Sequence, residues 1–256
     1  MPTPAKGYWL NGKRVPSVST ILGNAGWGND ALMDWAVKQT VTNLIDADID
    51  VRQFSADVIM ADYGYHKTRQ QAADVGTCAH AMCDAFLTEG TFDMDAFPQP
   101  IVDAAMPAYQ AFRQWAADQH LDVINTEFPL VSANHRYGGT PDALVKLGRD
   151  HVLLDFKTSN WLVPKHILQV CAYMDLVAEC MDITCDRGIV IQIRKDGHLA
   201  TMEVEGETIR RGREAFYYLL QLHRLKPSFE AITKSVNKPG AIPKSAEITF
   251  MGRKVA

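Results

Sequence analysis

Three residues in the middle of the chain have side chains suited to metal-assisted hydrolysis. A G-G-T-P-D segment ends at Asp142, and thirteen residues later Asp155 begins a D-F-K segment that ends at Lys157. Carboxylate oxygens are preferred ligands of hard divalent cations, and a nearby ammonium group stabilises developing negative charge. The two carboxylates and the amine therefore predict a site where a divalent cation and a water molecule act on a phosphodiester.

The residues around Asp155 indicate how this group is held. Residues 151–158 form a short apolar run that ends in charge, which is typical of a buried strand. Because successive side chains of a strand point to opposite faces, Asp155 and Lys157 share one face and Phe156 points the other way. A charged pair at the end of a buried strand is costly unless a cation, a second carboxylate or a polyanionic substrate compensates it.

A second predicted strand supplies the second carboxylate. Residues 137–147 open with a glycine pair and then alternate, and residues 148–150 provide the turn into the next strand. This hairpin places Asp142 beside Asp155, and the glycines allow another part of the chain to approach closely. Two adjacent carboxylates repel each other, and a hard cation relieves that repulsion.

Further motifs surround this hairpin. They are V-P-S-V-S-T-I-L at residues 15–22, a G-T-C-A-H segment that ends at His80, the D-F-K-T-S extension of the Asp155 strand, and a Q-x-x-x-Y spacing at Gln169 and Tyr173. Together with G-T-P-D, they resemble the RecB-like branch of the PD-(D/E)XK nuclease superfamily, which includes phage-type exonucleases and the mitochondrial genome maintenance exonuclease. The similarity spans roughly residues 8–205. D-x-K alone is a weak signal, whereas motifs in the family's order are specific.

The resemblance implies a role for each matching residue. Asp142, Asp155 and the backbone carbonyl of Phe156 would bind Mg²⁺ or Mn²⁺, and His80 would complete the protein ligands. Lys157 would orient or deprotonate the attacking water and help to neutralise the developing charge. Whether a second metal enters with the substrate stays open.

A predicted helix at residues 164–180 carries the next motif. It begins with a proline, which suits a first helical turn. A buried stripe is expected at Ile167, Val170, Cys171, Met174 and either Val177 or Ala178. Lys165, Gln169 and Tyr173 lie four apart on another stripe and would project together toward a phosphate backbone and a base. By the resemblance, Gln169 and Tyr173 also brace the site.

Several of these residues have a structural alternative. Asp155 and Lys157 could form a surface ion pair, Asp142 could be a turn residue, and His80 could be an ordinary histidine beside a core stripe of Val75, Ala79, Met82 and Phe86. Glu127, expected in a strand from Val123 to Leu130, is either a carboxylate supporting the metal site or a solvated side chain. Thr158 and Ser159 either donate to a phosphate or cap the end of the strand.

The order of elements predicts an α/β fold. We expect helices within residues 30–62 and at 99–119 and 207–225, and strands at 187–194 and 199–204. With the hairpin, they indicate a restriction-endonuclease-like mixed sheet flanked by helices. We divide the chain into an N-terminal helical region (1–120) that carries the metal histidine, a nuclease core (121–225) and a basic C-terminal segment (226–256), within a single compact domain.

The net charge of −4 has the wrong sign for a generic nucleic-acid binder. From Arg224 onward, however, seven basic residues stand against two acidic ones, which leaves −9 for residues 1–223. The basic segment could clamp a phosphate backbone or be a solvated tail, and the sequence leaves both open.

Composition predicts a cytoplasmic protein with no membrane association, and the resemblance implies a bacterium or a phage-infected cell. The sequence has no apolar signal core near Met1, no apolar run of membrane-spanning length and an odd number of cysteines, five. Some relatives carry a four-cysteine iron–sulfur cluster. No late C-x-x-C pair occurs here, so we expect none.

The predicted function is a Mg²⁺- or Mn²⁺-dependent deoxyribonuclease acting in recombination, replication or repair. The preference for an exonuclease on linear single- or double-stranded DNA comes from the resemblance alone. A structure-specific endonuclease and a non-catalytic DNA-binding subunit are the alternatives. Whether a recombination or replication partner protein delivers the substrate stays open.

Overall fold

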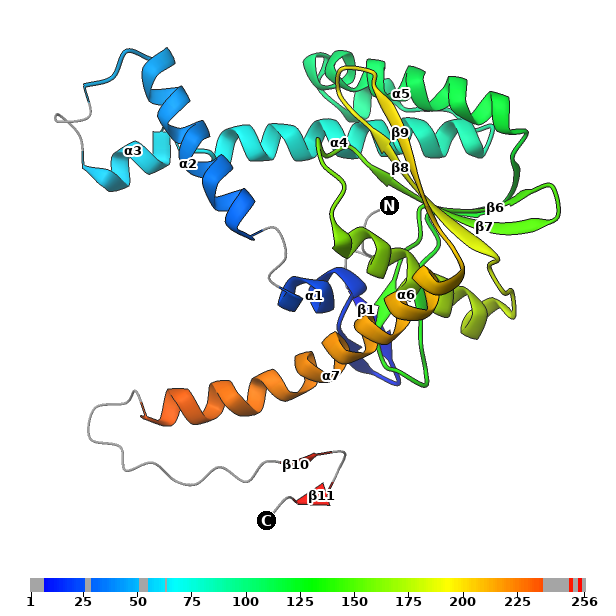
Figure 1. Cartoon of the computed structure of the whole chain (residues 1–256). Coiled ribbons are helices and arrows are strands. Elements are labelled where there is room, and N and C mark those ends of the chain that lie inside the picture. Colours follow the sequence, from blue (N-terminus) through cyan, green and yellow to red (C-terminus); the bar gives the residue numbers. More distant parts are fainter. Residues whose placement is uncertain are drawn as a thin grey trace.

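A five-stranded mixed sheet forms the centre of the computed structural model, which describes residues 7–25, 29–50, 55–62, 64–236, 249–250 and 253–254 (Figure 1). Its strands, in spatial order, are β3 (Asp122–Thr126), β6 (Ala143–Leu147), β7 (Asp150–Lys157), β8 (Arg187–Ile193) and β9 (Leu199–Val204). Only the β7–β8 pair is parallel within this sheet. The predicted α/β class with a mixed sheet is confirmed.

The predicted hairpin is formed by β6 and β7. Leu147 pairs with Asp150 across a turn at Gly148 and Arg149, and Gly148 adopts a positive φ of 64°, which glycine tolerates. At the open end Ala143 pairs with Leu154, so the residues before β6 lie next to the end of β7.

The strand expected at residues 137–147 is divided in two, and this part of the prediction is wrong. Gly138–Gly139 forms β5, which pairs with β4 (Leu130–Val131) instead of β7. Residues 140–142 lie between β5 and β6, where Pro141 has no N–H to give to a ladder. The glycines allow close approach, as expected: a Cβ on Gly138 would overlap the ring of Tyr8 in β1 (Tyr8–Leu10), and one on Gly139 the ring of Tyr173.

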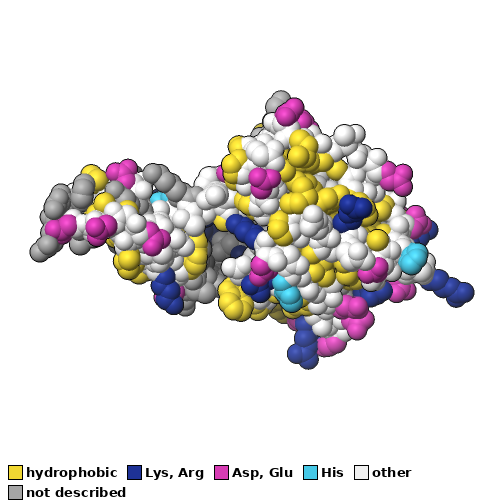
Figure 2. Space-filling model, turned by 90° about the horizontal axis from the view of Figure 1, so that it is seen from above, with side chains coloured by type: hydrophobic (Ala, Val, Ile, Leu, Met, Phe, Trp, Pro, Cys, Tyr) yellow, Lys and Arg dark blue, Asp and Glu magenta, His cyan; other side chains and the backbone are white. Residues whose placement is uncertain are grey.

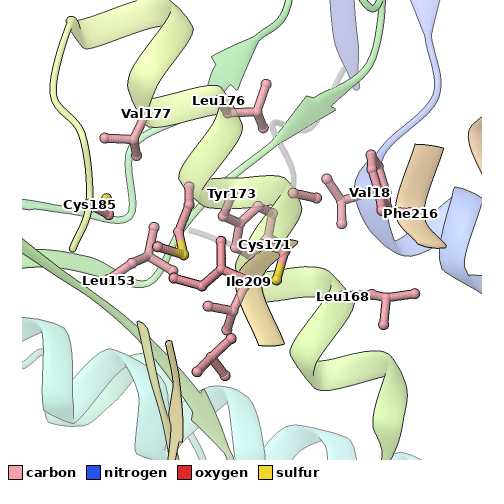
Figure 3. Close-up of a cluster of buried hydrophobic side chains, with 14 of the residues drawn as sticks. Val18, Leu153, Leu168, Cys171, Tyr173, Leu176, Val177, Cys185, Ile209 and Phe216 are labelled. Atoms are coloured by element: carbon pink, nitrogen blue, oxygen red, sulfur yellow. The ribbon is translucent and has the colours of Figure 1, made fainter. Parts of the chain in front are cut away.

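Helices cover both faces of the sheet (Figure 1). One face packs against α4 (His66–Leu87) and α5 (Gln99–Gln119), and the other against α1 (Val18–Leu22), α6 (Pro164–Met181) and α7 (Gly206–Val236). Leu153 belongs to the core on the α6 side, shown in Figure 3, whereas Leu154 and Phe156 belong to the core on the α4 side. This alternation confirms that Phe156 points away from the face of Asp155.

Helix α6 connects the parallel strands β7 and β8 and agrees closely with its prediction. Val170, Cys171, Met174 and Val177 are fully buried, and Ile167 is partly buried against the same core. Gly188 in β8 lets the helix lie close to the sheet, because a Cβ there would overlap the side chain of Val170.

Replacing Gly188 with alanine is therefore expected to destabilise the protein by about 1 to 3 kcal/mol, the usual cost of overpacking a core. Gly23, which follows α1, is the matched control, since it has a φ of −58° and no atom within 4 Å of an added Cβ. Urea denaturation of both variants measures the difference. Equal stabilities for Gly188→Ala and Gly23→Ala would contradict this packing.

The last predicted helix is longer than expected. Helix α7 continues to Val236, so its predicted end at Leu225 is wrong: Pro227 lies within the helix. A proline removes one hydrogen bond of a helix but does not always end it. The basic C-terminal segment lies largely outside the described residues, apart from the end of α7 and the strands β10 (Thr249–Phe250) and β11 (Arg253–Lys254). The division into three regions stays a prediction.

The acidic stretch near the N-terminus forms two helices, α2 (Asn29–Asp46) and α3 (Ala56–Asp62), which project from the body (Figure 1). Seen from above, acidic and hydrophobic side chains are interspersed along this arm (Figure 2). Within α2, Met33, Val37, Val41 and Ile45 are exposed hydrophobic residues, spaced four apart on one helical face. Outside this arm, the short strand β2 (Lys13–Val15) pairs with β1 in an antiparallel hairpin that precedes α1 in the chain.

Candidate metal centre

The structure brings Asp142, Asp155 and Lys157 together where β7 ends. Asp142 Oδ2 accepts a hydrogen bond from the backbone N–H of Phe156 at 2.6 Å. Lys157 Nζ forms an ion pair with Asp155 Oδ2 and donates to the backbone carbonyl of Phe156 at 3.3 Å. The three side chains therefore surround the Phe156 peptide unit, as the predicted hairpin requires.

Asp142 also belongs to a group of possible metal ligands, together with Glu127 and with His80 of α4. His80, Glu127 and Asp142 each offer one atom, and these atoms all lie within 4.8 Å of one another. His80 Nδ1 lies 3.7 Å from Asp142 Oδ1. An imidazole and two carboxylates at this spacing are a donor set that Mg²⁺ or Mn²⁺ accepts.

Glu127 reaches this cluster through a break in the sheet that the sequence did not reveal. The continuous strand expected from Val123 to Leu130 is wrong, because β3 ends at Thr126 and β4 begins at Leu130. Glu127 lies between them with a φ of 46°, in the left-handed region that non-glycine residues rarely adopt. Its N–H donates to the carbonyl oxygen of Asp142 at 2.9 Å, which holds the two acidic residues side by side.

The electrostatics of the two aspartates favour a cation. Burial raises the pKa of Asp155 to about 6, Lys157 opposes this rise, and Asp142 adds to it. Burial also raises the pKa of Asp142. Asp155 has no exposed surface, and its Oδ1 has no hydrogen-bond partner within the described part of the chain. An unsatisfied buried carboxylate is costly, so these residues fit a divalent cation.

The imidazole of His80 is in the neutral form that a metal ligand requires. Burial, with a contribution from Lys157, lowers the pKa of His80 to about 4. The imidazole is thus uncharged at neutral pH and keeps a lone pair available for coordination. Its ring also contacts that of Phe156 edge to face at a centroid distance of 5.7 Å, which fixes its position beside the end of β7.

These two shifts predict opposite effects of pH on the stability of the metal-free protein. Between pH 3.8 and about 6 the folded protein retains a proton on Asp155 that the unfolded chain has lost, so this group makes stability fall as pH rises. Between about pH 4 and 6.5 the unfolded chain holds a proton that folded His80 lacks, so His80 makes stability rise with pH.

We therefore expect the stability of Asp155→Asn to rise more steeply with pH than that of the wild type, and the stability of His80→Gln to rise less steeply. Urea denaturation in EDTA at pH 4.5 and pH 6 measures both slopes. If both variants keep the wild-type slope, the burial of these two groups is not as described.

A cleft of about 810 Å³ opens beside the candidate metal cluster, the group formed by the side chains of His80, Glu127 and Asp142. Lining residues predicted from the sequence are His80, Glu127, Asp142, Lys157, Gln169 and Tyr173. Gln169 Nε2 donates to the hydroxyl of Tyr173 at 3.0 Å, so the two side chains act as one unit. Asp155 is fully buried and does not line the cleft. Its ion-pair partner Lys157 does line it.

The remaining candidates lie outside this lining. Lys165 is exposed at the start of α6 and, unlike Gln169 and Tyr173, does not line the cleft. The Ser159 hydroxyl donates to the carbonyl of Trp161 at 2.8 Å, which matches the capping alternative. Thr158 lies against α4, where a Cβ on Gly76 would be 2.7 Å from its hydroxyl oxygen.

The cleft also contains residues that the sequence did not single out. Asp84 follows His80 by four residues, so the spacing of the α4 helix was a usable signal. Tyr8 lines the cleft and shares a 2.7 Å hydrogen bond with Thr140. Phe92 and Phe97 come from the connection between α4 and α5, and no motif marks them.

Comparisons with known proteins give only weak similarities. No family model matches the sequence, and no curated protein matches it. Among solved structures, the alkaline exonuclease LHK-Exo in complex with dAMP is 17% identical with a TM-score of 0.31, over 64% of this chain and 92% of that chain. LHK-Exo from Laribacter hongkongensis in another crystal structure is 15% identical with a TM-score of 0.30, over 49% and 70% of the two chains.

A third solved structure, of a protein named SSO0001, is 18% identical with a TM-score of 0.29, over 57% of this chain and 73% of that chain. Superpositions this loose show nothing about activity. Within the described residues, no helix has the length and apolar character needed to cross a membrane.

Proposed function

We propose that this protein is a divalent-metal-dependent nuclease that hydrolyses DNA phosphodiesters by water attack. The observation that carries the proposal is the meeting of His80, Glu127 and Asp142 within 4.8 Å, beside the Lys157–Asp155 ion pair and at the edge of a cleft. A metal cluster alone has many uses. A cluster with an adjacent lysine in a cleft is the arrangement that phosphodiester hydrolysis needs.

Each side chain has a distinct task in this proposal. His80, Glu127 and Asp142 would hold the cation from the cleft side, with Asp155 and the Phe156 carbonyl contributing from the strand end. When bound, Mg²⁺ or Mn²⁺ supplies Lewis acidity toward a phosphoryl oxygen and makes water a better nucleophile at neutral pH. Lys157, ion-paired with Asp155, presents its positive charge to the phosphate and favours the build-up of negative charge there.

Gln169 and Tyr173 would position the substrate. Their mutual hydrogen bond leaves the Gln169 carbonyl oxygen available as an acceptor and ties the amide to the wall of the cleft. Tyr173 is only 7% exposed, so its ring mainly supports the site by packing against Gly139 and the core of α6.

The RecB-like motifs favour an exonuclease acting on DNA ends, in recombination, replication or repair. A structure-specific endonuclease would use the same cluster, and a non-catalytic DNA-binding subunit would keep the fold without the reaction. Buried carboxylates with raised pKa values are costly to maintain, which favours a working metal site over the non-catalytic alternative.

Digestion of end-labelled linear DNA and covalently closed circular DNA, each with Mg²⁺, Mn²⁺ or EDTA, tests the proposal. Loss of linear DNA alone, with metal, supports the exonuclease, and cutting of circles supports the endonuclease. Binding without cleavage of either substrate by folded, metal-loaded protein would contradict the nuclease proposal.

A further inference from the structure

The connection between α4 and α5 forms the wall of the cleft that no predicted motif explains. It contributes Phe92 and Phe97, whose rings stack at a centroid distance of 6.0 Å with an interplanar angle of 12°. Both rings are partly buried against the core on the α4 side and keep some surface exposed. They therefore present an anchored aromatic surface to the cleft.

Local hydrogen bonds hold this connection in shape. The N–H of Gly90 donates to the carbonyl of Ala85 at 2.8 Å, where the chain leaves α4. The side chain of Asp93 accepts from the N–H of Asp95 at 3.0 Å and starts the short 3₁₀ helix η3 (Met94–Ala96) between the two phenylalanines. Rings held by turns and packing lose little entropy when a ligand binds.

In its described lining the cleft has too few positive charges to bind DNA mainly through phosphate contacts. Among the described residues that line it, Lys157 is the sole ammonium or guanidinium group, whereas Asp84, Asp93, Glu127 and Asp142 are acidic. DNA duplex binding normally depends on many lysine and arginine contacts to phosphates. Such contacts are scarce in this cleft, so stacking of bases on aromatic rings must supply much of the affinity besides the cation.

The size of the cleft agrees with this reasoning. Its volume of about 810 Å³ is that of a pocket for a small ligand. An aromatic face accepts any base by stacking, but only when the base is unpaired and can leave its neighbours.

We propose that Phe92 and Phe97 form a nucleobase subsite, which takes an unpaired base of the strand whose phosphate reaches the metal cluster. The inference rests on the proposed function and adds to it a substrate class, single-stranded DNA or a frayed end. The acidic residues around the rings favour neutral base over phosphate at this end of the cleft.

The test uses single-stranded oligonucleotides that carry 2-aminopurine at the terminal nucleotide, and the same strands annealed to a complement. Binding is measured in Ca²⁺, and gels verify that the substrate stays intact. Stacking quenches 2-aminopurine fluorescence. We expect the wild type to quench the single-stranded probe and to bind it about tenfold more tightly than the blunt duplex, the gain that one stacked base provides. The Phe92→Leu/Phe97→Leu variant should lose the quenching and about tenfold in affinity for the single strand.

Leucine replaces each ring with another large apolar side chain, so the thermal unfolding temperature of this variant should stay close to that of the wild type. Met94→Ala is the matched control, since Met94 is 48% exposed in the same connection and is not part of this cleft's lining. Equal affinities for single strand and duplex, retained quenching in the leucine variant, or an equal loss in Met94→Ala would each overturn the subsite. Cleavage in Mg²⁺, measured separately, reports on the nuclease proposal: quenching without cleavage refutes that proposal, and cleavage without quenching refutes the subsite.

Discussion

Asp142→Asn is expected to lower the rate of DNA cleavage by about 10³-fold, the scale on which losing a preorganised charge-stabilising group acts. Asparagine keeps an oxygen that can accept from the Phe156 N–H, so the bend before β6 should keep its shape. It lacks the negative charge that Asp142 offers to a cation beside Glu127 and the neutral His80. The variant should therefore fold normally, bind Mn²⁺ more weakly and fail to cleave.

Single-turnover cleavage and Mn²⁺ binding by calorimetry measure these losses. Asp150→Asn is the matched control, because Asp150 lies at the other end of the same hairpin, is 48% exposed and pairs with Arg187 at 3.4 Å. Wild-type cleavage by Asp142→Asn, or an equal loss in Asp150→Asn, is the result that would remove Asp142 from the site.

Lys157→Met is expected both to abolish cleavage and to destabilise the fold by about 3 to 5 kcal/mol at pH 8, the cost of leaving a buried charge without its partner. Asp155 is fully buried and pairs with Lys157. Without the ammonium group the pKa of Asp155 rises further. The cost is therefore present above that raised pKa and disappears as falling pH protonates the carboxylate.

The double variant Lys157→Met/Asp155→Asn separates the two effects. It should recover most of the lost stability at pH 8, because the unpaired buried charge of Asp155 is gone, and stay inactive. Urea denaturation at pH 8 and pH 5 is the measurement. If Lys157→Met is as stable as the wild type at pH 8, or if the double variant is no more stable than the single, the pair is not buried as described.

The parts of the fold that the sequence predicts correctly are those set by local rules. Alternation and a glycine turn predict the β6–β7 hairpin, and a leading proline with helical spacing predicts α6, so Asp142, Asp155 and Lys157 are placed correctly in relation to one another. These signals act over a few residues, and the folded chain does not override them.

The missed parts depend on contacts between distant segments. A glutamate seldom adopts a positive φ, so nothing in the sequence predicts that the sheet breaks at Glu127, where a hydrogen bond to Asp142 holds the turn. Pro227 predicts the end of a helix, yet α7 continues past it. Phe92 and Phe97 enter the cleft only because α4 and α5 pack side by side, which no local pattern encodes.

Anomalous diffraction from crystals of the protein soaked in Mn²⁺ tests the central claim most directly. The account predicts a manganese peak within about 2.5 Å of side-chain atoms of His80, Glu127 and Asp142, the distance range of such bonds. A fully occupied manganese ion elsewhere, with these three side chains in place and no peak among them, would contradict it.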